Sequence, residues 1–108
     1  MSYFTPQTKV VKLDDENSVT IRKLTFGPRQ EIIDASTGVD SDMNVIMHVG
    51  SGRTRMLELS IVSWTGPSFE GRPVTPANIA ELPGEVADVI LQAADDLQAG
   101  LTDDEKKA

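Results

Sequence analysis

The sequence predicts an α+β domain in which a small N-terminal β-hairpin or sheet packs with a mostly helical C-terminal part. Two β-forming segments around a polar turn in residues 9–24 predict the hairpin. A single apolar stripe with helical spacing in residues 84–99 predicts a long last helix. The length of 108 residues suits one domain. We expect it to span residues 1–100, followed by a disordered, charged tail at residues 101–108.

The hairpin is the first expected element. Lys9 to Leu13 contains two adjacent valines, and Val19 to Leu24 alternates apolar and polar residues, so both segments suit strands. The polar cluster Asp14 to Asn17 lies between them and is typical of a turn. These features predict two antiparallel strands joined by a tight connection.

A helix is expected after the hairpin. Thr25 or Gly27 can cap it, and Pro28 suits the first helical position. Glu31 would then lie in the first turn, where its charge suits the helix dipole. Ser36 to Gly38 should end the helix after two or three turns.

The middle of the chain is harder to interpret. Gly38 to Asp42 is expected to be a polar loop. Met43 to Val49 fits both a strand and a helix, and its β-branched residues favour the strand slightly. The glycines of Gly50 to Gly52 then predict a break. Arg53 to Trp64 is expected to be a helix, because its apolar residues recur at i, i+4 and i+7, and it should end near the turn Thr65 to Pro67.

The last third of the chain contains strong helix signals. A loop from Pro67 to Pro73 precedes Thr75, whose hydroxyl can cap a short helix at Pro76 to Glu81. Leu82-Pro83 is a joint, since the residue before proline disfavours helix. Gly84 to Ala99 is the last expected helix. Its expected apolar stripe consists of Val86, Val89, Ile90, Ala93 and Leu97.

Composition limits the classes of function. The chain carries 17 acidic and 10 basic residues, a net charge of −7, which repels phosphates, so we expect no nucleic-acid partner. The longest uncharged apolar stretch, Leu59 to Trp64, is far too short for a membrane span, so no membrane partner is expected. There is no cysteine and only one histidine, His48. We therefore expect no enzyme, no catalytic residue, no cofactor and no metal site.

The most informative stretch runs from Leu57 to Pro83. We expect Trp64 to anchor its Gly-Pro loop against the core, and Phe69 to fold back onto this tryptophan. The order Ile61 to Trp64, then Gly66 to Ile79, then Leu82-Pro83 and an amphipathic helix resembles tail assembly chaperones of siphophages, the long-tailed bacteriophages. The hairpin and following helix are also similar, so the resemblance covers most of the chain.

The resemblance implies a function in virion morphogenesis. Such chaperones coat the tape measure protein before the tail tube polymerises around it, and they recruit tail tube protein. They are made in two lengths by a ribosomal frameshift. The expected partners are therefore the tape measure protein, the tail tube protein, a frameshifted longer form of the chain itself and further copies in a homo-oligomer. The expected location is the host cytoplasm during assembly, and the protein should be absent from the mature virion.

Partner contact is expected at apolar residues, because a groove between helices can hold a partner helix. Methionines suit such a surface, since their side chains adapt to varied partners. The candidate partner-binding residues are Trp64, Phe69, Met43, Met47, Val86, Ile90 and Leu97.

Three other interpretations remain open. A structural head-tail connector or tail completion protein would share the small size but remain in purified particles. A small enzyme would need a pocket with converging polar groups, such as His48 together with Asp42 and Arg53. An acidic mimic of nucleic acid would need dense, regular carboxylates, whereas apolar stripes interrupt those of this chain.

Overall fold

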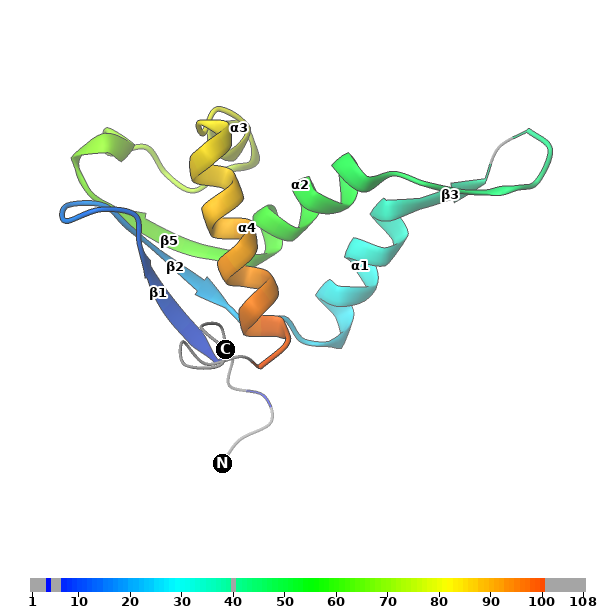
Figure 1. The fold of residues 1–108 in the computed structure, drawn as a ribbon, viewed down its shortest axis with the longest axis horizontal. Coiled ribbons are helices and arrows are strands. Elements are labelled where there is room, and N and C mark those ends of the chain that lie inside the picture. Colours follow the sequence, from blue (N-terminus) through cyan, green and yellow to red (C-terminus); the bar gives the residue numbers. More distant parts are fainter. Residues whose placement is uncertain (1–3, 5–6, 40, 101–108) are drawn as a thin grey trace.

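The computed structural model describes Phe4, residues 7–39 and residues 41–100, and the tail expected at residues 101–108 lies outside these ranges. The fold is α+β, as the sequence predicts, with an N-terminal antiparallel sheet and C-terminal helices (Figure 1). The strands are β1 (Thr8–Lys12), β2 (Ser18–Arg22), β3 (Thr37–Val39), β4 (Val45–Met47) and β5 (Ile61–Thr65). The helices are α1 (Phe26–Ser36), α2 (Val49–Ser60), the 3-10 turn η1 (Pro67–Phe69), α3 (Pro76–Ala80) and α4 (Gly84–Gln98).

The predicted hairpin is confirmed and forms part of a larger sheet. β1 pairs with β2, and β5 pairs with the other side of β2, all antiparallel, in the order β1-β2-β5. Val11 lies opposite Val19, and Ile21 follows two residues later, so these three side chains share one face. That face is buried, because α4 packs across β1 and β2 (Figure 1).

The helix predicted at Arg53 to Trp64 is wrong in its last four residues, because α2 ends at Ser60 and the chain continues as β5. A register shift between β2 and β5 explains the error: Trp64 lies opposite Val19, whereas Ile61 lies opposite Ile21. Such a bulge inserts one extra residue and turns side chains three positions apart to the same face. Spacing typical of a helix therefore occurs in a strand.

The segment from α1 to α2 also differs from expectation. α1 begins at Phe26, so Pro28 occupies the third helical position and Glu31 lies beyond the first turn. β4 confirms the preference for a strand in residues 43–49, and its pairing with β3 was not anticipated. The break expected at Gly50 to Gly52 is wrong, because these residues lie inside α2.

The C-terminal helices begin and end close to where the sequence places them. The Thr75 hydroxyl accepts a hydrogen bond from the backbone N–H of Asn78 at 3.2 Å and caps α3 as predicted. In α4, Ile90, Ala93 and Leu97 are buried in the core. Val89 is exposed, contrary to the predicted stripe, because the buried face of α4 is centred on Ile90 and Ala94 and Val89 lies at its margin, and Leu91 is buried instead.

A polar network joins the hairpin turn to the loop after β5. Asn17 is only 5% exposed, and its side-chain amide donates to Asp14 and, at 3.0 Å, to the hydroxyl of Ser68. The Ser68 backbone N–H donates to Asn17 Oδ1, also at 3.0 Å. Both the N–H groups and the oxygen of this buried amide therefore have hydrogen-bond partners. The amide connects two turns that lie 51 residues apart in the chain.

The loop after β5 is closed by aromatic packing. The rings of Trp64 and Phe69 are stacked, with centroids 4.9 Å apart and an angle of 6° between the planes, as the sequence predicts. Trp64 Nε1 also donates a 2.7 Å hydrogen bond to the carbonyl oxygen of Arg72. The loop is therefore fixed at both ends against the sheet.

Gly66 should be irreplaceable at the contact between these two turns. Its φ of +131° suits only glycine, and an added Cβ would collide with Asn17 Oδ1 and the Glu16 carbonyl. We expect Gly66→Ala to lower the free energy of unfolding by about 2–4 kcal/mol, measured by urea denaturation. Gly71→Ala is the matched control, because Gly71 also has a positive φ but open space around its Cα. Its expected loss is about 1 kcal/mol; equal losses in both variants would contradict the steric explanation.

Asp14 should make the stability of the fold depend on pH. The Asn17 side chain, and then the backbone N–H groups of Glu16 and Asn17, donate to this carboxylate and lower its pKa. A lowered folded-state pKa stabilises the fold above the unfolded-state pKa, and this stabilisation is lost as pH falls through the folded-state value. Asp14→Asn should therefore cost stability at pH 7, and the difference from wild type should shrink below about pH 4. Asp15→Asn removes a carboxylate outside this network. In thermal unfolding scans, its difference in stability from wild type should not change with pH in this way.

Candidate functional site

Apolar side chains are unusually exposed in residues 26–49, which we call the arm: α1, the β3–β4 ribbon and the first residue of α2. Eight of the twelve exposed large hydrophobic residues in the described ranges lie there, and α1 contains no buried residue. The eight are Phe26, Ile33, Val39, Met43, Val45, Ile46, Met47 and Val49. Isolated exposed hydrophobic residues are ordinary, but such a concentration in one segment is typical of a binding surface.

The β3–β4 ribbon extends away from the sheet and from α4 (Figure 1). Thr37 lies opposite Met47, and Val39 lies opposite Val45, in a ladder of three residue pairs. All three residues of β4 are exposed. A two-stranded ribbon of this length is marginally stable in water without further burial, so a covering partner would stabilise this part of the arm.

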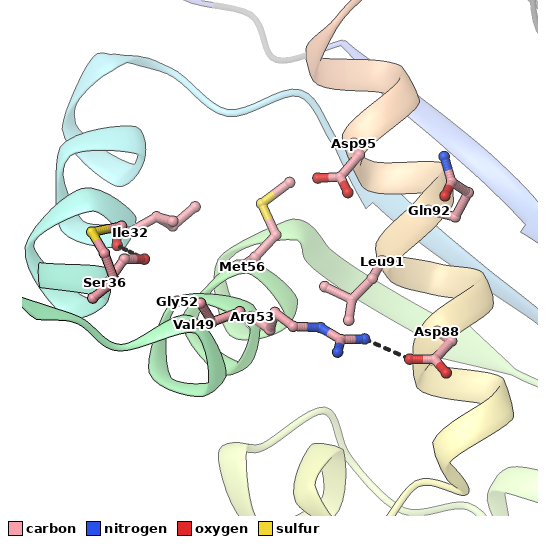
Figure 2. Close-up of a pocket in the computed structure, with 11 residues that line it drawn as sticks. Ile32, Ser36, Val49, Gly52, Arg53, Met56, Asp88, Leu91, Gln92 and Asp95 are labelled. Carbon is pink, nitrogen blue, oxygen red and sulfur yellow. Dashed lines mark hydrogen bonds and ion pairs between the residues drawn. The ribbon is translucent and has the colours of Figure 1, made fainter.

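A groove separates the arm from α4, and α2 forms its floor (Figure 2). It encloses about 590 Å³. Ile32 of α1 and Met47 of β4 line one wall, Leu91 of α4 lines the other, and Met56 of α2 lies between them. In Figure 2, Met56 and Leu91 extend from neighbouring helices beside the groove. Both belong to the core and are 8% exposed, so only the edges of their side chains line the groove. The groove is thus lined by apolar side chains from segments far apart in sequence.

Tight helix packing closes one end of the groove. A Cβ on Gly52 would collide with the Ser36 side chain of α1, so only glycine permits this close approach of α1 and α2. Ser36 donates a 2.7 Å hydrogen bond to the carbonyl of Ile32. The glycine at position 52, which predicted a break after a strand, therefore permits a close helix contact.

One ion pair spans the mouth of the groove. Arg53 Nη2 of α2 lies 2.6 Å from Asp88 Oδ1 of α4 (Figure 2). Both side chains are more than half exposed, and an ion pair in water contributes at most about 1 kcal/mol. It can therefore open at little energetic cost to let a ligand pass.

The predicted contact residues divide into two groups. Met43 and Met47 are exposed on the arm, and Trp64 and Val86 are half-buried. Phe69, Ile90 and Leu97 lie in the hydrophobic core, where they stabilise the fold. Their apolar periodicity predicted burial correctly but could not show that their own chain covers them.

The sequence interpretation missed most of the arm. Phe26, Ile33, Val45, Ile46 and Val49 were not among the candidates, although all are exposed. The available signal was a set of apolar residues in segments with neither a clear helical stripe nor a long strand pattern. Which of them remain uncovered depends on the tertiary arrangement of α1 and the ribbon.

Two of the polar residues considered for an enzyme site, Arg53 and His48, have contacts in the structure. Arg53 pairs with Asp88, and the His48 ring lies close to Gly38 of β3, where it would meet an added Cβ. In residues 7–39 and 41–100, together with Phe4, no group of three or more His, Asp or Glu side chains could hold a metal ion. Of the described helices, none is both long and apolar enough to cross a membrane.

Comparison of the chain with protein-family models, with curated proteins and with solved structures finds no match. A function must therefore be inferred from the chain's own geometry. Its most distinctive feature is the exposed apolar arm beside a groove.

The division between core and arm predicts contrasting mutational effects. Ile90 is fully buried, so Ile90→Ala should lower the free energy of unfolding by about 2–5 kcal/mol. Val45 is 74% exposed, so Val45→Ala should change it by less than about 0.5 kcal/mol. Urea denaturation of both variants at two protein concentrations measures these changes in the free energy of unfolding. A loss at Val45 as large as that at Ile90 would show that the ribbon is covered in solution.

Proposed function

We propose that this chain is a tail assembly chaperone of a long-tailed bacteriophage, which binds the tape measure protein during tail morphogenesis. The observation that carries the proposal is the exposed apolar arm beside an apolar groove. The resemblance of residues 61–99 to such chaperones supports the same function. In this proposal the protein acts by covering apolar surface of another chain, with no chemical reaction.

A chaperone of this kind must expose apolar surface and still stay dispersed. The net charge of −7 supplies repulsion between copies that opposes aggregation. Met43 and Met47 give the arm flexible, polarizable side chains, which adapt to partner segments of different sequence.

The proposal extends to the setting of assembly. The protein would act in the host cytoplasm, recruit tail tube protein to the coated tape measure protein, and leave before the virion matures. A frameshifted longer form would carry the same domain and the same arm. Copies bound side by side along a long helical partner would form a homo-oligomer on that partner.

Co-expression tests the proposal. A fragment of the tape measure protein encoded beside this chain should be mostly insoluble alone, and its soluble fraction should rise several-fold with the wild-type chaperone. Val39→Asp with Val45→Asp should remove most of this gain, because buried charge disfavours the contact. Val10→Asp with Val62→Asp is the matched control, since both residues are comparably exposed but lie on the sheet.

Two results would contradict the proposal. The first is an unchanged soluble fraction of the fragment with wild-type protein, although both chains are expressed. The second is a stoichiometric amount of the protein in purified mature virions, detected by mass spectrometry. That second result would favour a head-tail connector or tail completion protein.

A further inference from the structure

The α4 wall of the groove is acidic. α4 contains Glu85, Asp88, Asp95 and Asp96 and has no lysine or arginine. Asp88 and Asp95 both line the groove, on either side of the apolar Leu91. They are seven residues apart, which places them on one helix face about 10 Å from each other. The wall thus presents two carboxylates of fixed spacing above an apolar floor.

These carboxylates are available to a ligand. Asp95 is exposed and forms no ion pair within the described part of the chain. Among the described residues, Asp88 pairs only with Arg53, across the mouth of the groove, in water. A cation entering the groove could therefore contact Asp95 directly and replace Arg53 at Asp88 without breaking a buried interaction.

The apolar part of the groove suits a helix. Its walls are the helices α1 and α4, and its floor is α2. A fourth helix can pack against these three with its rows of side chains between theirs. A helix satisfies its own backbone hydrogen bonds and needs only side-chain contacts from the groove. Met47 and Met56 supply adaptable contacts for an apolar stripe.

We infer that the groove binds an amphipathic helix of another chain whose apolar stripe is flanked by lysine or arginine residues seven positions apart. The apolar stripe would lie on Ile32, Met56 and Leu91, and the two cations would face Asp88 and Asp95. The net charge of −7 favours a basic partner over a second copy of this chain. The inference rests on the proposed function in treating the groove as the place where a partner binds.

Two synthetic peptides of about 20 residues test the charge preference. Both carry leucines at i, i+3, i+4 and i+7, and one has flanking lysines seven positions apart where the other has glutamates. Isothermal titration calorimetry with the full-length protein should give a dissociation constant at least about tenfold lower for the lysine peptide. Raising the salt concentration should reduce the difference between the dissociation constants of the two peptides, because salt screens the charges.

Paired variants locate the binding site. Met47→Asp should weaken binding of the lysine peptide by about tenfold or more, because Met47 lines the groove. Met43→Asp should change it by less than about twofold, since Met43 is exposed on the same ribbon but does not line the groove. Asp95→Lys should weaken binding of the lysine peptide and strengthen binding of the glutamate peptide. Asp15→Lys, in the hairpin turn, should change neither affinity.

Three outcomes would overturn the inference. These are equal affinity for the two peptides, equal effects of Met47→Asp and Met43→Asp, and a concentration-dependent dimer that Met47→Asp dissociates, which would make a second copy the occupant. The proposed function is tested separately by co-expression. If the tape measure fragment is solubilised while no peptide binds the groove, the inference fails and the chaperone proposal stands.

Discussion

The side-chain amide of Asn17 joins the hairpin turn to the loop that follows β5, and the rest of the fold depends on this junction. By bonding Asp14 and Ser68 together, it holds β5 against β2 and completes the sheet. Because β5 begins directly after Ser60, its position determines where α2 ends and in which direction this helix leaves the sheet. The junction is remote from the groove, yet it orients the helix that forms the groove floor.

α2 connects the stable and the exposed parts of the molecule. Its C-terminal half, with Met56 and Leu57, is buried beside the sheet, whereas its N-terminal half carries α1 and the ribbon away from it. Since α1 packs mainly on α2, the arm gains little burial from the main core. The low burial of the arm and the high burial of the core therefore meet in one helix that is shared between them.

Local signals predicted the elements whose partners are close in sequence. The hairpin, the Thr75 cap and the Trp64–Phe69 stack each depend on residues within about one turn or loop of each other. The β5 strand could not be predicted in this way, because its bulge gives Ile61 and Trp64 a helical spacing and its pairing partner lies some 40 residues away. For the same reason, the sequence suggested a groove between helices and included Met47 but could not give the other lining residues, since the walls meet only in the folded chain.

In the proposed function, the position of the acidic residues would let an apolar arm be exposed without association between copies. α4 faces the groove with Asp88 and Asp95, so a second copy that entered with its own acidic surface would place like charges close together. A basic helix would instead gain both apolar burial and ion pairs in a site that excludes part of the water. In the proposed function, the same two carboxylates would disfavour self-association and favour a partner of opposite charge, which is the discrimination that a chaperone with exposed apolar surface requires.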